Sequence, residues 1–236
     1  MPMIEVTNLT KRYRDRVAID NLNFTVEKGE ILGFLGPNGA GKSTTMKILT
    51  GFLPPTEGKA KIDGFDVFEQ PLEVKKRIGY LPETPPLYPE MTVRGYLHFV
   101  GRLKGLGGNT LKDEIDRVTK ATGTTSEIDR LIGALSKGYQ HRVGLAQAML
   151  GTPPLMILDE PTEGLDPKQR NEVLALIKSL AGKQTIVLST HILSEVEAIA
   201  QKVLIINRGK IAAYDTLANV AGSGGLLSRF AELTSA

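Results

Sequence analysis

The glycine-rich segment at residues 36–43 restricts the possible folds of this chain more than any other feature. It matches the pattern G-x-x-x-x-G-K-[ST], in which glycines allow the backbone to turn so that successive N–H groups converge on phosphate oxygens. The N-terminus of a following helix adds positive potential. The pattern therefore predicts a phosphate-binding loop. The residues expected to contact a nucleotide here are Gly36, Pro37, Asn38, Gly39, Ala40, Gly41, Lys42, Ser43 and Thr44.

Two side chains of this segment are expected to carry its chemistry. Lys42 would reach the β- and γ-phosphates of a nucleotide, and the Ser43 hydroxyl would coordinate Mg²⁺. An apolar run at residues 30–35, typical of a strand buried on both faces, precedes the segment, and residues 43–49 have a helical pattern. The alternative is a glycine-rich turn with a purely structural role. Phosphate binding requires a loop between a buried strand and a helix, and the segment has this placement, which favours the phosphate-binding interpretation.

The rest of the chain alternates strand and helix patterns. Residues 155–158, 185–188 and 203–206 are further short apolar runs, and residues 167–180 have helical spacing with a proline suited to the first turn. Such alternation predicts an α/β fold with a mostly parallel sheet. Residues 4–6 and 17–26 are also expected to be strands.

The middle of the chain has a different character. Residues 82–89 hold four prolines, which exclude a regular element, and residues 91–150 show helical patterning with few strand signals. We interpret this as a helical subdomain, about 84–150, inserted into an α/β domain that spans residues 1–220. Residues 221–236 are expected to form a short, peripheral C-terminal tail with a weak helical pattern.

Composition excludes several classes of protein. Cysteine is absent, which removes disulfides and thiolate metal sites, and no apolar stretch among the 236 residues is long enough to cross a membrane. The first residues lack the features of a secretory signal, so a cytosolic location is expected. The net charge is +3, and the densest basic run, residues 75–77, is interpreted as a solvated helix face. No nucleic-acid partner is expected.

Candidate catalytic groups follow two of the predicted strands. Asp159 and Glu160 come at the end of the run at 155–158, where ligands of open α/β sheets bind. Asp159 would hold Mg²⁺, directly or through water, and Glu160 would act on the attacking water. An Asp-Glu pair after a strand is by itself more often a helix cap or a solvated turn. In a chain that also has a phosphate-binding loop, the catalytic interpretation is favoured instead. His191, after the run at 185–188, is a candidate sensor of the γ-phosphate, although a lone histidine is usually structural.

Together these motifs resemble those of the ATP-binding cassette (ABC) ATPase family. Residues 36–44 resemble its Walker A motif, residues 155–160 its Walker B motif, and residues 164–166 its D-loop. His191 resembles the switch histidine, and Tyr13 occupies the place of an aromatic residue that stacks on adenine. Residues 135–140, Leu-Ser-Lys-Gly-Tyr-Gln, occupy the place of the signature LSGGQ. The resemblance extends from about residue 4 to about residue 215.

The resemblance implies an ATPase with a composite site. Cassettes of this family pair head to tail, so Ser136 and the N–H of Gly138 would grip the γ-phosphate of ATP bound to a second cassette, in a homodimer or a heterodimer. Ser136 can also serve as an N-cap, and both roles can hold at once. The implied ligands are ATP and Mg²⁺. The implied fold is a P-loop NTPase core with an N-terminal antiparallel β subdomain and an inserted α-helical subdomain.

Two positions depart from the family pattern. Lys137 and Tyr139 replace a glycine and the glutamine of the signature, while Ser136 and Gly138 remain. At the Q-loop, where glutamine is usual, the chain has Glu83. A carboxylate can still bind Mg²⁺ or its water, so Glu83 is expected to retain the role of linking the metal to the membrane partner. The expected metal ligands are Ser43, Asp159 and Glu83.

Residues 79–93 and the signature narrow the resemblance to bacterial ABC-2-type exporter ATPases, the multidrug, gliding-motility and copper-processing group. The resemblance implies a subunit at the inner face of the cell membrane that couples ATP hydrolysis to transport, and export is the expected direction. Integral permease subunits would dock on the proline-rich loop and on residues 88–99. A soluble ABC ATPase serving DNA repair, chromosome structure or translation is the alternative, and a small-molecule kinase is a further one.

Overall fold

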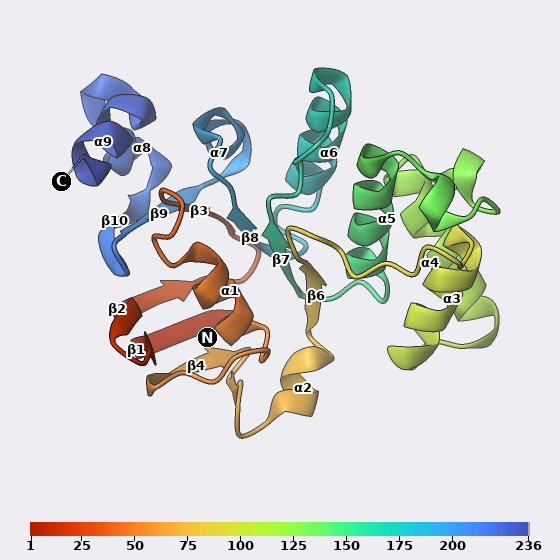
Figure 1. The fold of residues 1–236 in the computed structure, drawn as a ribbon, viewed down its shortest axis with the longest axis horizontal. Helices are drawn as coiled ribbons and strands as arrows, with labels where there is room; N and C mark the ends of the chain where they lie inside the picture. The colour runs from red at the N-terminus through yellow and green to blue at the C-terminus, as the bar shows by residue number, and fades with distance from the viewer. Residues whose placement is uncertain (236) are drawn as a thin grey trace.

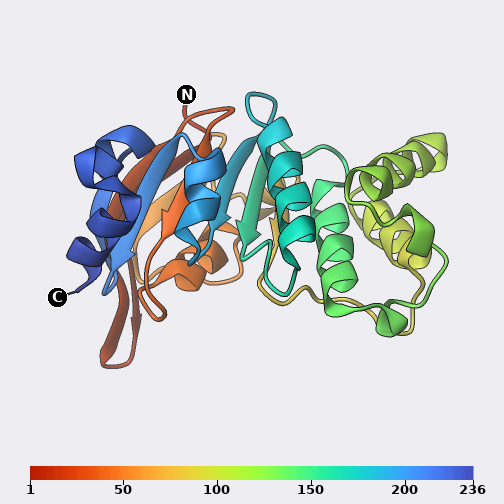
Figure 2. The same ribbon diagram turned by 90° about the horizontal axis from the view of Figure 1, so that it is seen from above.

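The computed structural model describes residues 1–235 and contains two sheets with helices around them (Figures 1 and 2). The smaller sheet is antiparallel and has the strand order β2-β1-β4-β5. Its strands are β1 (Ile4–Tyr13), β2 (Arg16–Val26), β4 (Glu57–Ile62) and β5 (Phe65–Asp66). The expected N-terminal antiparallel β subdomain is therefore confirmed.

The larger sheet has the order β10-β9-β3-β8-β7-β6, and all its neighbouring pairs are parallel except β9 and β10. Every residue of β3, β7 and β8 is buried, as their uninterrupted apolar sequences predict. The mostly parallel α/β core is confirmed. The strands are β3 (Ile31–Leu35), β6 (Ile78–Leu81), β7 (Leu155–Asp159), β8 (Thr185–Ser189), β9 (Lys202–Asn207) and β10 (Lys210–Thr216).

Helices surround these sheets, and short-range sequence features determine where some of them begin and how closely they pack. The Asp166 side chain caps α6 by accepting a hydrogen bond of 2.9 Å from the Gln169 N–H, and Pro167 occupies the first turn. Helix α7 packs closely on β3, where a Cβ on Gly33 would lie 2.4 Å from Val196 Cγ1. These helices are α1 (Lys42–Leu49), α2 (Pro71–Lys75), α6 (Pro167–Ser179), α7 (Leu193–Ile199), α8 (Leu217–Ala221) and α9 (Gly225–Thr234).

Three more helices lie between β6 and β7 in the chain and gather at the end of the molecule remote from α9 (Figure 1). They are α3 (Val93–Leu103), α4 (Gly108–Ala121) and α5 (Lys137–Met149), with 3₁₀ turns at Thr125–Glu127 and Ile132–Ala134. The proline-rich residues before α3 form no helix or strand, as expected. Among residues 1–235, no helix combines the length and apolarity needed to span a bilayer.

Two segments differ from expectation. The segment expected to be a peripheral tail with a weak helical pattern contains the whole of α9, but Leu226 of this helix is fully buried; Ala236 lies outside the described residues. In the basic run at 75–77, the Arg77 side chain is only 25% exposed and is held by other residues. Its guanidinium pairs with Asp63 at 3.2 Å and Glu73 at 3.0 Å and lies 4.0 Å from the centroid of Phe65, because the chain leaves the helix before Arg77 and turns toward β6.

Candidate functional site

A cavity of about 810 Å³ opens where the glycine-rich loop meets the carboxyl ends of β7 and β8. It brings together most of the site residues that the sequence predicts. They are Tyr13, Gly36, Pro37, Asn38, Gly39, Gly41, Lys42, Ser43, Thr44, Glu83, Asp159, Glu160 and His191. Ala40 is buried and does not line the cavity. Arg16, Ala18, Glu163 and Phe230 also line it and were not predicted.

The glycines of the loop are required by its geometry. Gly39 and Gly41 have positive φ angles of 78° and 114°, which side chains disfavour. A Cβ on Gly36 would lie 2.4 Å from the Ile206 carbonyl oxygen, and one on Gly41 would lie 2.7 Å from Ile19 Cγ2. The loop therefore passes so close to β9 and β2 that only glycine fits at these two positions.

The ammonium group of Lys42 is held inside the loop. It donates hydrogen bonds of 2.7 Å to the Gly36 carbonyl oxygen and 3.3 Å to that of Pro37. Burial lowers the pKa of Lys42, an effect that Glu160, Asp159 and Glu83 partly oppose. The lysine is thus positioned beside the loop and within the electrostatic reach of three carboxylates.

Two adjacent carboxylates, Asp159 at the end of β7 and Glu160 immediately after it, are both buried. Burial raises the pKa of Asp159 and of Glu160, while Lys42 acts against both shifts. Asp159 Oδ1 is buried and has no hydrogen-bond partner among the described residues. Glu160 has a φ angle of 51°, and its N–H donates a 2.8 Å bond to the Ser189 carbonyl oxygen on β8. This backbone conformation turns the Glu160 side chain toward the residues that follow β8.

A hydrogen-bond network joins Glu160 to the segment after β8. His191 Nδ1 lies 3.0 Å from Glu160 Oε1. The Thr190 hydroxyl lies 3.3 Å from Glu160 Oε2 and 2.9 Å from Oε2 of the buried Glu195, so it is within hydrogen-bond distance of two carboxylates. Glu195 also accepts a hydrogen bond from the Thr162 hydroxyl. Glu195 was not predicted, because a glutamate in a helical pattern carries no signal of burial.

Ser136 and Gly138 do not line the cavity. They lie in the first turn of α5, where Ser136 is the N-cap and accepts a 3.3 Å hydrogen bond from the Tyr139 N–H. A Cβ on Gly138 would lie 3.0 Å from Gln169 Oε1 of α6. Within one chain these two residues therefore lie outside the cavity at the glycine-rich loop.

The cavity offers oxygen ligands suited to Mg²⁺. Asp159 supplies an unpartnered buried carboxylate oxygen, and Ser43 and Glu83 line the same space. Within residues 1–235, no three His, Cys, Asp or Glu side chains are grouped closely enough to hold a metal ion by themselves. A cation that binds here would therefore need further oxygen ligands, which the phosphates of a nucleotide can provide.

The fold and this cavity together define a P-loop nucleotide-binding protein. The family model described as "ABC transporter" matches residues 19–163, more than half of the chain, and the chain belongs to that family. It is accordingly an ATP-binding and ATP-hydrolysing subunit of an ABC transporter. The family assignment made from the motifs is confirmed.

Individual relatives agree with this assignment. The chain is 42% identical over 211 residues to the bacitracin transport ATP-binding protein BcrA of Bacillus licheniformis, covering 89% of this chain and 68% of the relative. A solved ATP-binding subunit of an ABC transporter superposes with a TM-score of 0.91 at 30% identity, covering 98% of this chain and 99% of the other. The dimeric bacterial cassette MJ0796 superposes with a TM-score of 0.84 at 25% identity, covering 91% and 98%.

Proposed function

We propose that this chain energises a membrane exporter through ATP-driven, head-to-tail pairing with a second cassette. The observation that supports it most directly is the convergence of Lys42, Glu160 and His191 on one cavity beside the glycine-rich loop. Lys42 would bind the β- and γ-phosphates. Glu160 would accept the proton of the attacking water, and His191 would hold the Glu160 carboxylate and sense the γ-phosphate.

The proposed metal ligands are Ser43, Asp159 and Glu83. Bound Mg²⁺ supplies positive charge that neutralises the phosphate oxygens as negative charge develops. Glu83 lines both this cavity and a second cavity of about 440 Å³ that also includes Gln140 and Lys137 of α5. It therefore lies between the nucleotide site and the inserted helices, which suits the proposed role of connecting metal binding to the membrane partner.

The proposed pairing completes the site across two chains. Ser136 and Gly138 lie on a helix N-terminus, which favours binding of an anion such as the partner's γ-phosphate. The dimeric form of the similar cassette MJ0796 supports such pairing. Hydrolysis would remove the shared phosphate and release the two cassettes.

Glu160→Gln tests the proposed catalytic role. The variant should bind ATP normally, lose turnover by about 100-fold or more, and accumulate as a dimer in Mg²⁺-ATP, because the amide cannot accept the proton of water. Steady-state ATPase rates and size-exclusion chromatography measure both effects. Glu197→Gln, at an exposed position of α7, is the matched control. Near-normal turnover of the Glu160→Gln chain would contradict the assignment.

A membrane location separates this function from that of a soluble ABC ATPase. The proline-rich loop and α3 are proposed to receive a cytoplasmic segment of a permease, which would place the chain on the inner face of the membrane. The sequence between residues 79 and 93, similar to ABC-2-type exporters, supports export. Co-purification with an integral membrane protein from the native cell is the expected result. A chain that never sediments with native membranes would instead favour the soluble alternative.

A further inference from the structure

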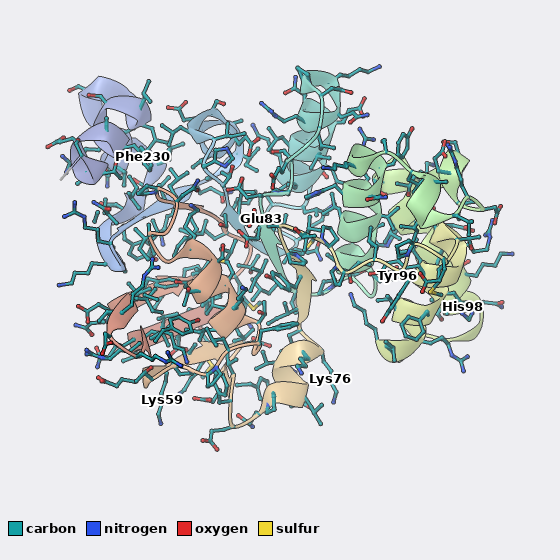
Figure 3. All side chains as sticks on the ribbon, in the orientation of Figure 1. Lys59, Lys76, Glu83, Tyr96, His98 and Phe230 are labelled. Carbon is teal, nitrogen blue, oxygen red and sulfur yellow. The ribbon has the colours of Figure 1, made fainter. Side chains whose placement is uncertain are left out.

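Helix α9 brings an aromatic side chain to the nucleotide cavity from the far end of the sequence. Phe230 lines the cavity together with the glycine-rich loop and Tyr13. Figure 3 shows Phe230 on the side of α9 that faces this loop. Figures 1 and 2 both show α9 and the β1–β2 hairpin on the same side of the molecule as the loop. Two aromatic residues from opposite ends of the chain thus border one cavity.

The position of Phe230 is fixed from both sides. Toward the N-terminus of α9, Leu226 is fully buried, and Phe230 itself packs against the same hydrophobic core. Toward the C-terminus, Asn207 Nδ2 donates a 3.0 Å hydrogen bond to the Leu233 carbonyl oxygen. Asn207 ends β9, and two residues further on the Gly209 N–H donates a 2.9 Å bond to the Ala40 carbonyl oxygen of the glycine-rich loop. Helix α9 is therefore connected to the loop through one turn.

The residues that line the cavity are suited to different parts of a nucleotide. Lys42, Asp159, Glu160, Glu83 and His191 are suited to phosphate, metal and water. A phenylalanine can contribute none of those contacts, since it has no hydrogen-bonding group, and its favourable partner is an apolar or π surface. The purine base is the part of ATP that presents such a surface.

We propose that Phe230 is a second aromatic contact for the base of the bound nucleotide, in addition to Tyr13. The inference rests on the proposed ATP-hydrolysing function of this cavity and deepens it, because it makes α9 a part of the nucleotide site. An aromatic ring that contacts a base strengthens binding without reading its hydrogen-bonding edge. Phe230 therefore contributes to affinity for nucleotides and adds nothing to affinity for the phosphate chain alone.

Comparison of ATP with inorganic tripolyphosphate tests this inference. Isothermal titration calorimetry with Mg²⁺ gives the Kd of ATP and of tripolyphosphate. The Glu160→Gln background is used because it suppresses ATP hydrolysis during the titration. Phe230→Leu should weaken ATP binding by about 5- to 10-fold, because the apolar packing is kept and the ring is lost. Tripolyphosphate binding should stay within about 2-fold. Phe230→Tyr, which retains the ring, should restore ATP affinity.

Control variants distinguish a contact between Phe230 and the base from an indirect effect of α9 on the glycine-rich loop. Leu227 is 69% exposed on the same helix, so Leu227→Ala should change neither affinity. Equal losses for both probes in Phe230→Leu would show that α9 merely supports the loop and would overturn the inference. Unchanged ATP affinity in Phe230→Leu would overturn it as well.

Lys42→Ala distinguishes failure of this inference from failure of the proposed site. It should abolish binding of ATP and of tripolyphosphate if the cavity is the nucleotide site. Retained ATP binding in Lys42→Ala would overturn the site itself. Loss of binding in Lys42→Ala combined with unchanged affinity in Phe230→Leu would overturn only the role of Phe230.

Discussion

At the scale of single residues, the buried Asp159, a proposed metal ligand, is expected to lower the stability of the nucleotide-free protein at neutral pH. Its carboxyl is 3% exposed, has an unpartnered oxygen, and has a pKa raised by burial. The folded state therefore holds a proton on Asp159 at pH values where the unfolded state has released it. The contribution of this group to stability is fully present below its unfolded pKa of about 3.8 and is lost as the pH rises through the higher folded pKa.

We expect Asp159→Asn to stabilise the nucleotide-free protein at pH 7. The uncharged amide avoids the cost of burying an ion, and the melting temperature should rise by roughly 2–4 °C, the shift that about 1 kcal/mol produces in a domain of this size. The gain should shrink as the pH falls toward 4. Differential scanning fluorimetry at several pH values measures both effects. Asp113→Asn, on the exposed face of α4, should change little. A lower melting temperature at pH 7 would contradict the argument.

At the scale of elements, α5 is pressed against β6 and the loop that follows it. A Cβ on Gly79 of β6 would lie 2.1 Å from the Ala148 carbonyl oxygen of α5. One on Gly144 of α5 would lie 2.7 Å from Pro85 Cγ in the proline-rich loop. Helix α5, which Ser136 caps, is thus packed closely against β6 and the loop that carries Glu83.

Gly79→Ala should therefore destabilise the protein by about 1–3 kcal/mol, the usual cost of overpacking, because the added methyl group meets backbone atoms that cannot rotate away. Gly107→Ala is the matched control, since its Cβ would meet nothing within 4 Å. Urea denaturation at equal protein concentration gives the difference. Equal stability of the two variants would show that α5 moves freely against β6.

The sequence predicted the elements whose signals are local. β3, β7 and β8 are fully buried and consist mainly of apolar residues. The loop at 36–43 needs its glycines for reasons that lie within the loop or its nearest strands. β4, β5, β6, β10, α2, α7 and α8 were not assigned. Of these, β4, β5 and α2 are short and largely or partly exposed, and they carry no clear periodicity. The helical pattern of α9 was visible, but its burial depends on contacts with β9 that are remote in sequence.

The difference between local signals and contacts remote in sequence also decides which cavity residues the sequence could predict. The sequence pointed to Glu160 and His191, which both line the cavity, because each follows a buried strand whose end is recognisable in the sequence. Glu195 and Phe230 were missed, since each belongs to an ordinary amphipathic helix, and only the packing of that helix brings the residue to Thr190 or to the cavity. Their recognition required the three-dimensional arrangement.

At the scale of the whole molecule, an aromatic cluster marks the inserted helices. Tyr88 and Phe99 have ring centroids 5.9 Å apart, and Tyr88 also contacts Tyr96 at 6.1 Å. Phe99 is 41% exposed although it is apolar. The cluster lies at the expected permease-docking surface, far from α9 (Figure 3).

Phe99→Glu should weaken docking on the permease without impairing the cassette. The introduced charge would be buried in an apolar contact, so the fraction of the chain that sediments with native membranes should fall by about 10-fold or more. ATPase activity in solution should stay within 2-fold of the unsubstituted chain, roughly the effect of a surface substitution. Phe52→Glu, at a residue that is 79% exposed outside the inserted helices, is the control. Unchanged membrane association of Phe99→Glu would contradict the docking proposal.

The short turn between β9 and β10 has a consequence for protein engineering. Its Gly209 donates to Ala40 in the glycine-rich loop and accepts a 2.8 Å hydrogen bond from the Asp20 N–H of β2, while Asn207 binds Leu233 of α9. Surface turns between strands normally tolerate tags, linkers and circular permutation. This one joins three walls of the nucleotide cavity, so a peptide inserted here would separate the walls even though it touches no catalytic side chain.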